Sequence, residues 1–147
     1  MSRTVVAGYD GSEVSRAAVA EAAGRAGPDG TVYVVYGFGV PPDFLGAPYY
    51  ERLLEEREGR GRELLDALLT ERAGALPPAN YEAELIGGPV ADAINTVART
   101  RKADEIVLGA RGLGAVRAAL GSVSQAVLRD ADRPVVVIPA AALARGG

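Results

Sequence analysis

The chain has 147 residues, of which 48% are apolar and 24% are charged, and this composition is typical of a single globular domain. Its formal net charge is −3 with both signs interspersed, which argues against a broad DNA- or RNA-binding surface. The sequence contains no cysteine and no histidine, so disulfides, thiolate or imidazole metal sites and Ser-His-Asp triads are excluded. A bound metal would have to be a hard cation held by carboxylates and by the phosphates of a ligand.

The N-terminal residues lack the apolar core of a signal peptide, because Met1–Thr4 runs directly into a strand pattern. No apolar run approaches the length of a membrane span. We therefore expect a soluble, cytoplasmic protein.

Short apolar runs and helical periodicity alternate from the start of the chain. The β-branched run Thr4–Gly8 predicts a strand that is buried on both faces. Glu13–Arg25 has apolar residues at helical spacing, and Ser12 is placed to cap this helix. Thr31–Tyr36 predicts a second buried strand.

The middle of the chain predicts a long helix followed by an edge strand. Tyr49–Ala75 is amphipathic, with leucines along one stripe, and we expect Gly59 and Gly61 to fray or break this helix. Tyr81–Ile86 alternates as a strand near a sheet edge does. A helix then starts at the Gly87–Pro89 turn and runs to about Arg101.

The last third of the chain repeats the alternation. Asp104–Leu108 predicts a fourth strand and Val135–Ile138 a fifth, between two prolines. Between them a helix begins at Ser122, which we expect to form a capping box with Gln125. Residues 140–147 resemble a short loose tail. Strand and helix alternate throughout, so we expect one α/β domain over residues 1–147, a doubly wound parallel sheet with helices on both faces.

The connection from Gly109 to Ser122 is the strongest functional signal. It is long for a simple loop, rich in glycine, and lies between the end of a strand and the start of a helix. Glycine allows the backbone to approach a ligand closely, and the first amides of a helix bind anions. We therefore predict a phosphate-bearing small molecule here, although a glycine-rich surface loop is the simpler alternative. Arg111 and Arg117 would pair with phosphate oxygens or would be solvated.

Asp10 lies just past the first strand and, if the first and fourth strands are neighbours, faces the same crevice as this loop. A carboxylate there would accept from an adenine amine or a ribose hydroxyl, or would only form a turn. The apolar last strand has a different implication, because an open edge of this kind pairs with another chain unless the tail or a helix covers it. A two-fold dimer through Val135–Ile138 is the prediction.

Taken together, these motifs resemble the universal stress protein family over essentially the whole chain. The matching segments are Val5–Ser12, the glycine loop, Val123–Leu128 and Ala131–Ile138. ATP-binding members of that family carry Gly-x2-Gly-x9-Gly-Ser/Thr after the fourth strand. Here Gly109, Gly112, Gly121 and Ser122 supply both ends of the pattern, with Leu113–Leu120 one residue shorter than its middle.

The resemblance implies a five-stranded parallel sheet in the order 3-2-1-4-5, a homodimer through the last strand, and ATP with Mg²⁺ or Mn²⁺ between the first and fourth strands. It places four residues around the adenine end: Gly8, Asp10, Gly37 and Leu108. It places the others along the ribose and phosphates: Gly109, Arg111, Gly112, Gly121, Ser122, Val123 and Ser124.

The function that follows from the resemblance is a stress-response protein that binds ATP and acts as a nucleotide-dependent switch or a partner-binding module. We expect at most slow ATP hydrolysis, since no histidine is available to activate water. Two alternatives stay open on the same fold: a nucleotide-free dimerisation module and a slow nucleotide hydrolase or transferase. A flavin-binding protein is less consistent with the sequence, because its phosphate loop would follow the first strand.

Overall fold

The computed structural model describes residues 2–110 and 120–145. Five parallel strands form one sheet in the order β3-β2-β1-β4-β5, as the sequence and the family resemblance predict. The strands are β1 (Thr4–Gly8), β2 (Thr31–Phe38), β3 (Asn80–Gly87), β4 (Glu105–Gly109) and β5 (Val135–Ile138).

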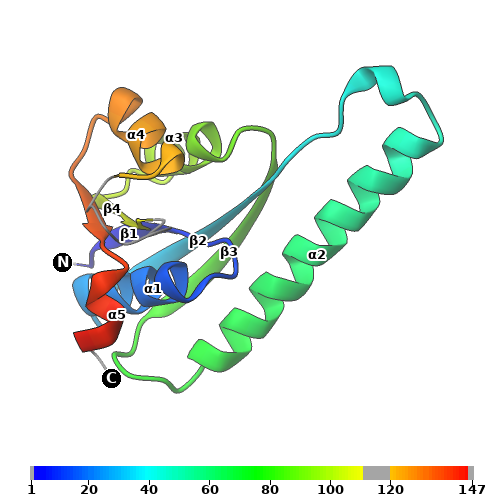
Figure 1. The fold of residues 1–147 in the computed structure, drawn as a ribbon. Helices are drawn as coiled ribbons and strands as arrows, with labels where there is room; N and C mark the ends of the chain where they lie inside the picture. The colour runs from blue at the N-terminus through cyan, green and yellow to red at the C-terminus, as the bar shows by residue number, and fades with distance from the viewer. Residues whose placement is uncertain (1, 111–119, 146–147) are drawn as a thin grey trace.

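Helices cover both faces of the sheet (Figure 1). One face packs against α1 (Glu13–Ala26) and the second half of α2 (Tyr49–Arg72), and the other packs against α3 (Val90–Thr100) and α4 (Ser122–Asp130). The central strands β1 and β4 are buried on both sides, as their continuous β-branched sequences predict. No helix of the described residues is long and apolar enough to cross a membrane.

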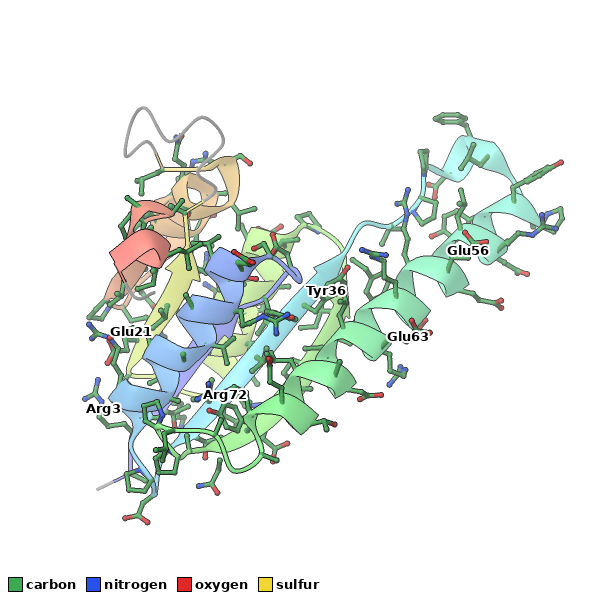
Figure 2. The ribbon with its side chains drawn as sticks, turned by 60° about the horizontal axis from the view of Figure 1, so that its bottom comes forward. Arg3, Glu21, Tyr36, Glu56, Glu63 and Arg72 are labelled. Atoms are coloured by element: carbon green, nitrogen blue, oxygen red, sulfur yellow. The ribbon has the colours of Figure 1, made fainter. Side chains whose placement is uncertain are left out.

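Helix α2 is continuous through Gly59 and Gly61, so the predicted break is wrong. Gly61 is buried where α2 packs against β2 and β3: a Cβ at this position would lie 2.6 Å from Leu85 Cδ1 and 2.7 Å from the Tyr36 ring. Figure 2 shows Tyr36 beside α2, whereas Glu56 projects from the first half of the helix. The glycine therefore allows close packing, and this packing outweighs its low helix propensity.

The C-terminal residues also differ from the prediction. Ala141–Arg145 forms a short helix, α5, where a loose tail was expected. It lies near α1 and the end of β5 (Figure 1). Two short-range hydrogen bonds hold the start of α5. The Ala142 N–H donates to the Pro139 carbonyl, and the Leu143 N–H donates to the Ala140 carbonyl.

Candidate functional site

A pocket opens where the carboxyl ends of β1 and β4 meet the first turns of α1 and α4. It encloses about 550 Å³, including space open to solvent at its mouth. Small-molecule sites in doubly wound sheets lie at this edge. Its described lining consists of Gly8, Tyr9, Asp10, Ser12, Val14, Ser15, Val90, Ile94, Leu108, Gly109, Gly121, Val123 and Ser124.

Most of the described residues that the sequence assigns to a site come together in this pocket. Asp10 and both described ends of the glycine loop line the same space, as predicted. Ser122 is exposed and is not part of the lining, and neither is Gly37. Arg111, Gly112 and Arg117 lie outside the described residues. The predicted residues that the pocket unites are Gly8, Asp10, Leu108, Gly109, Gly121, Val123 and Ser124.

The pocket also has an apolar wall that the sequence did not reveal. Val14 comes from α1, while Val90 and Ile94 come from α3 on the other side of the sheet. In the sequence these residues are part of ordinary helical periodicity, which carries no signal that distinguishes a pocket wall from a core face. Together with Leu108 they form an apolar surface suited to a planar ring.

The strand glycines have packing partners within the protein. A Cβ on Gly109 would lie 2.8 Å from the backbone of Val14, and a Cβ on Gly8 would lie 3.0 Å from Ile94 Cδ1 and from Leu108 Cδ2. Gly37, on β2, would meet Val90 Cγ2 at 2.8 Å. These glycines bring strands and helices close together, and this requirement holds whether or not a ligand is bound.

Strand β2 extends beyond the end of β1, and this determines where the main-chain groups of Gly37 point. The ladder from β1 ends with the Tyr9 N–H donating to the Val35 carbonyl at 2.9 Å, while the Phe38 carbonyl faces β3, where it accepts from the Gly88 N–H. The main-chain N–H and C=O groups of successive residues in a strand point to opposite sides. The N–H and C=O of Gly37 therefore point to the β1 side, past the last bond of that ladder.

The start of α4 lacks the predicted capping box. Gly121, not Ser122, occupies the N-cap position, and it has no side chain to bond the first-turn amides. Gln125 instead donates from Nε2 to the Leu120 carbonyl at 2.9 Å. The Gln125 N–H bonds to the Gly121 carbonyl, so the amides of Ser122, Val123 and Ser124 precede the first intrahelical bond of α4. This end of α4 presents donors and a partial positive charge to the pocket.

Ser124 adds a hydroxyl at the same point. The residue is 2% exposed and lines the pocket. A hydroxyl in a pocket wall can donate to, and accept from, a polar ligand group or water.

The opposite rim of the pocket carries a serine–aspartate cluster at the start of α1. Ser12 caps the helix as predicted, accepting from the Ser15 N–H at 3.2 Å. The Ser12 N–H donates to Asp10 Oδ1 at 2.9 Å, and the Ser15 hydroxyl lies 2.8 Å from the same oxygen. The pocket is thus acidic at the α1 rim and electropositive at the α4 rim.

Comparison with known proteins identifies the family. The model of the universal stress protein family matches residues 1–139. The chain belongs to the universal stress protein family. A universal stress protein of Thermus aquaticus is 36% identical over 140 residues, covering 94% of this chain and 99% of its own. A universal stress protein of Methanocaldococcus jannaschii is 34% identical over 143 residues, covering 92% of this chain and 81% of its own.

Several solved structures have the same fold. The hypothetical protein MJ0577 superimposes with a TM-score of 0.80 at 16% identity, over 95% of this chain and 96% of its own. A universal stress protein in complex with cAMP gives 0.65 at 25% identity, over 93% and 97%. An Arabidopsis thaliana family member with AMP bound gives 0.65 at 19% identity, over 93% and 91%.

Proposed function

We propose that this universal stress protein binds ATP in the pocket between β1 and β4 and acts in the cytoplasm as a nucleotide-dependent switch or partner-binding module. The observation that carries the proposal is the start of α4, which has no side-chain cap and lies with Ser124 in the pocket lining, facing an apolar wall. A helix start of this kind binds phosphate, and the wall accommodates a base. The cAMP and AMP complexes of related proteins support an adenine nucleotide.

Charge orients the ligand. Phosphates are repelled by the carboxylate of Asp10 and attracted by the start of α4, so they lie along Gly121, Ser122, Val123 and Ser124. The nucleoside then lies toward Asp10, Gly8 and Leu108, where the carboxylate accepts from an amine or a ribose hydroxyl. The main-chain groups of Gly37 offer one donor and one acceptor to a base edge. Gly109, with Arg111 and Gly112, completes the expected contacts along the ribose and phosphates.

A divalent cation fits this site only as a companion of the nucleotide. Among the residues that the structure describes, no three acidic side chains gather to hold a metal ion. Mg²⁺ or Mn²⁺ would therefore be held by phosphate oxygens, for which it has a strong preference, and would neutralise their charge. The chain has no histidine to activate water, so binding and release, rather than rapid hydrolysis, account for the proposed switch.

Replacing Ser124 by alanine should weaken ATP binding about tenfold or more, because a hydrogen bond to a charged group contributes about 1.5–3 kcal/mol. Gly121→Val should weaken it further by placing a side chain at the phosphate rim. Titration of ATP with Mg²⁺, followed by calorimetry, measures both effects. Arg129→Ala, at the other end of α4, is the matched control and should leave the affinity unchanged.

The unmutated protein provides the primary test of the proposal. Purified without added nucleotide and then denatured, it should release ATP, or else it should take up ATP in the titration. No binding at millimolar ATP with Mg²⁺ would contradict the proposal and favour the nucleotide-free module. Phosphate release well above a protein-free control would favour a slow hydrolase.

The proposal includes a homodimer through β5, one of the two edge strands of the described sheet. The Ile106 N–H donates to Pro134 and the Ala110 N–H donates to Ile138, so the main-chain groups of residues 134, 136 and 138 face β4. Those of Val135 and Val137 face away from the sheet. An apolar strand with outward main-chain donors and acceptors is suited to pairing with a second copy.

Val137→Pro should convert this dimer to a monomer with little loss of thermal stability. Proline removes an N–H that points away from β4, so the ladder within the protomer is kept. Sedimentation analysis measures the oligomeric state. Val136→Pro is the contrasting variant, because it removes a donor facing β4 and should lower the melting temperature. A Val137→Pro protein that stays dimeric would rule out pairing through this edge.

A further inference from the structure

A serine inside α1 contacts both the main chain and the side chain of Asp10. Ser15 lies in the first turn of α1 and is only 5% exposed. Its Oγ is 2.8 Å from Oδ1 of Asp10 and accepts from the Asp10 N–H at 3.2 Å. The sequence alone does not single out Ser15, because a serine in the first turn of a helix is common and carries no functional signal by itself.

The single proton of the Ser15 hydroxyl has two acceptors within reach. Asp10 Oδ1 lies at 2.8 Å and the Ser12 carbonyl oxygen at 2.9 Å. A bond to an ionised carboxylate is stronger than one to a neutral carbonyl, so the proton is donated to Asp10. The Ser12 hydroxyl, 3.1 Å away, then donates to Ser15 Oγ. The two hydroxyls thus form a chain of hydrogen bonds that ends at Oδ1 of Asp10.

The side chain of Asp10 is exposed at the pocket rim. The bond from the Ser12 N–H to Oδ1 is a local turn contact between residues two positions apart. Ser15 differs because it is buried in a helix that packs against the sheet, so it ties the carboxylate to a rigid element.

We propose that Ser15 is a positioning residue that fixes the carboxylate of Asp10 in a single rotamer before the ligand arrives. The gain is preorganisation: the nucleoside end of the ligand meets an acceptor that is already oriented, and no rotamer entropy is lost on binding. This inference rests on the proposed nucleotide site. Ser15 acts through Asp10, so its contribution to affinity exists only while Asp10 is present.

The first measurement needs no ligand. In the full-length protein, scalar couplings across the Cα–Cβ bond of Asp10 report its χ1 rotamers, and they should show one rotamer in the unmutated protein and averaging in Ser15→Ala. The second measurement is an ATP titration with Mg²⁺ of Ser15→Ala, Asp10→Ala and the double variant. Ser15→Ala should weaken binding about two- to tenfold when Asp10 is present, which is the expected scale for immobilising one side chain. It should have no further effect when Asp10 is alanine.

Each outcome has one meaning. A single Asp10 rotamer in Ser15→Ala, or an equal loss of affinity with and without Asp10, would overturn the positioning role. If the unmutated protein bound no ATP, the proposed function would be wrong, while the rotamer measurement would still decide whether Ser15 fixes Asp10. Arg16→Ala is the matched control: it removes the neighbouring exposed pair with Glu71 and should change neither readout. Thermal denaturation verifies that each variant is folded.

Discussion

Gly61→Ala should lower the free energy of unfolding by about 2 kcal/mol, whereas Gly59→Ala in the same helix should raise it by about 1 kcal/mol. The added methyl at Gly61 would overlap Leu85 Cδ1 at 2.6 Å and the Tyr36 ring at 2.7 Å, so either these side chains or α2 must shift. At Gly59 a Cβ meets nothing within 4 Å, and alanine gains only its better helix propensity.

Chemical denaturation of the two variants and the unmutated protein tests this pair. The two positions are two residues apart on one helix, so differences in helix propensity cancel and only the packing against the sheet differs. Equal effects from both substitutions, in either direction, would show that α2 does not pack against the sheet at Gly61 as described.

Glu105→Gln should lower the free energy of unfolding by about 2 kcal/mol, because it removes a buried charge from between two arginines. Glu105 is 5% exposed at the start of β4, where it accepts from Arg3 and, at 2.7 Å, from Arg25 Nη1. Burial opposes the charged form of Arg25, but the hydrogen bond and charge of Glu105, followed by those of Glu21, raise the pKa of Arg25 above its ordinary value.

The control for Glu105 is Glu21→Gln, which removes the exposed partner of the same arginine (Figure 2). Exposed pairs contribute about 0–1 kcal/mol, so this variant should lie close to the unmutated protein. Urea denaturation at low and high salt separates the two, since salt screens the exposed pair far more than the buried one. A Glu105→Gln protein as stable as Glu21→Gln would contradict the structural role of the buried carboxylate.

The sheet was predictable from sequence because its physical basis is local. Each central strand is a short β-branched run, each is followed by helical periodicity, and handedness restricts how such units wind. The strand order was not in those patterns; it came from the resemblance to the family. The position of Asp10 and Gly121 in one pocket was also predictable from the sequence. Residues at the carboxyl ends of neighbouring parallel strands, and at the helix starts that follow, lie at the same edge of the sheet.

The remaining features depend on contacts between distant segments. Gly61 looked like a weak point because its packing partners, Tyr36 and Leu85, lie on two other elements. The predicted capping box does not form, because the Gln125 side chain donates to the Leu120 carbonyl. The sequence motif alone does not specify this acceptor. Ser15 had one usable signal, its place three residues after Ser12 and five after Asp10, which puts all three at one helix start.

The packing role of Gly8, Gly37 and Gly109 limits what a glycine motif can report about a protein of this family. A descendant that lost its ligand would still need small residues at these positions to keep its helices seated on the strands. Retention of these glycines is therefore uninformative about nucleotide binding. If the proposed function is right, the more informative positions are the hydroxyl at Ser124 and the helix start at Gly121, which has no side-chain cap. Sorting family members into binders and non-binders should begin with these two positions.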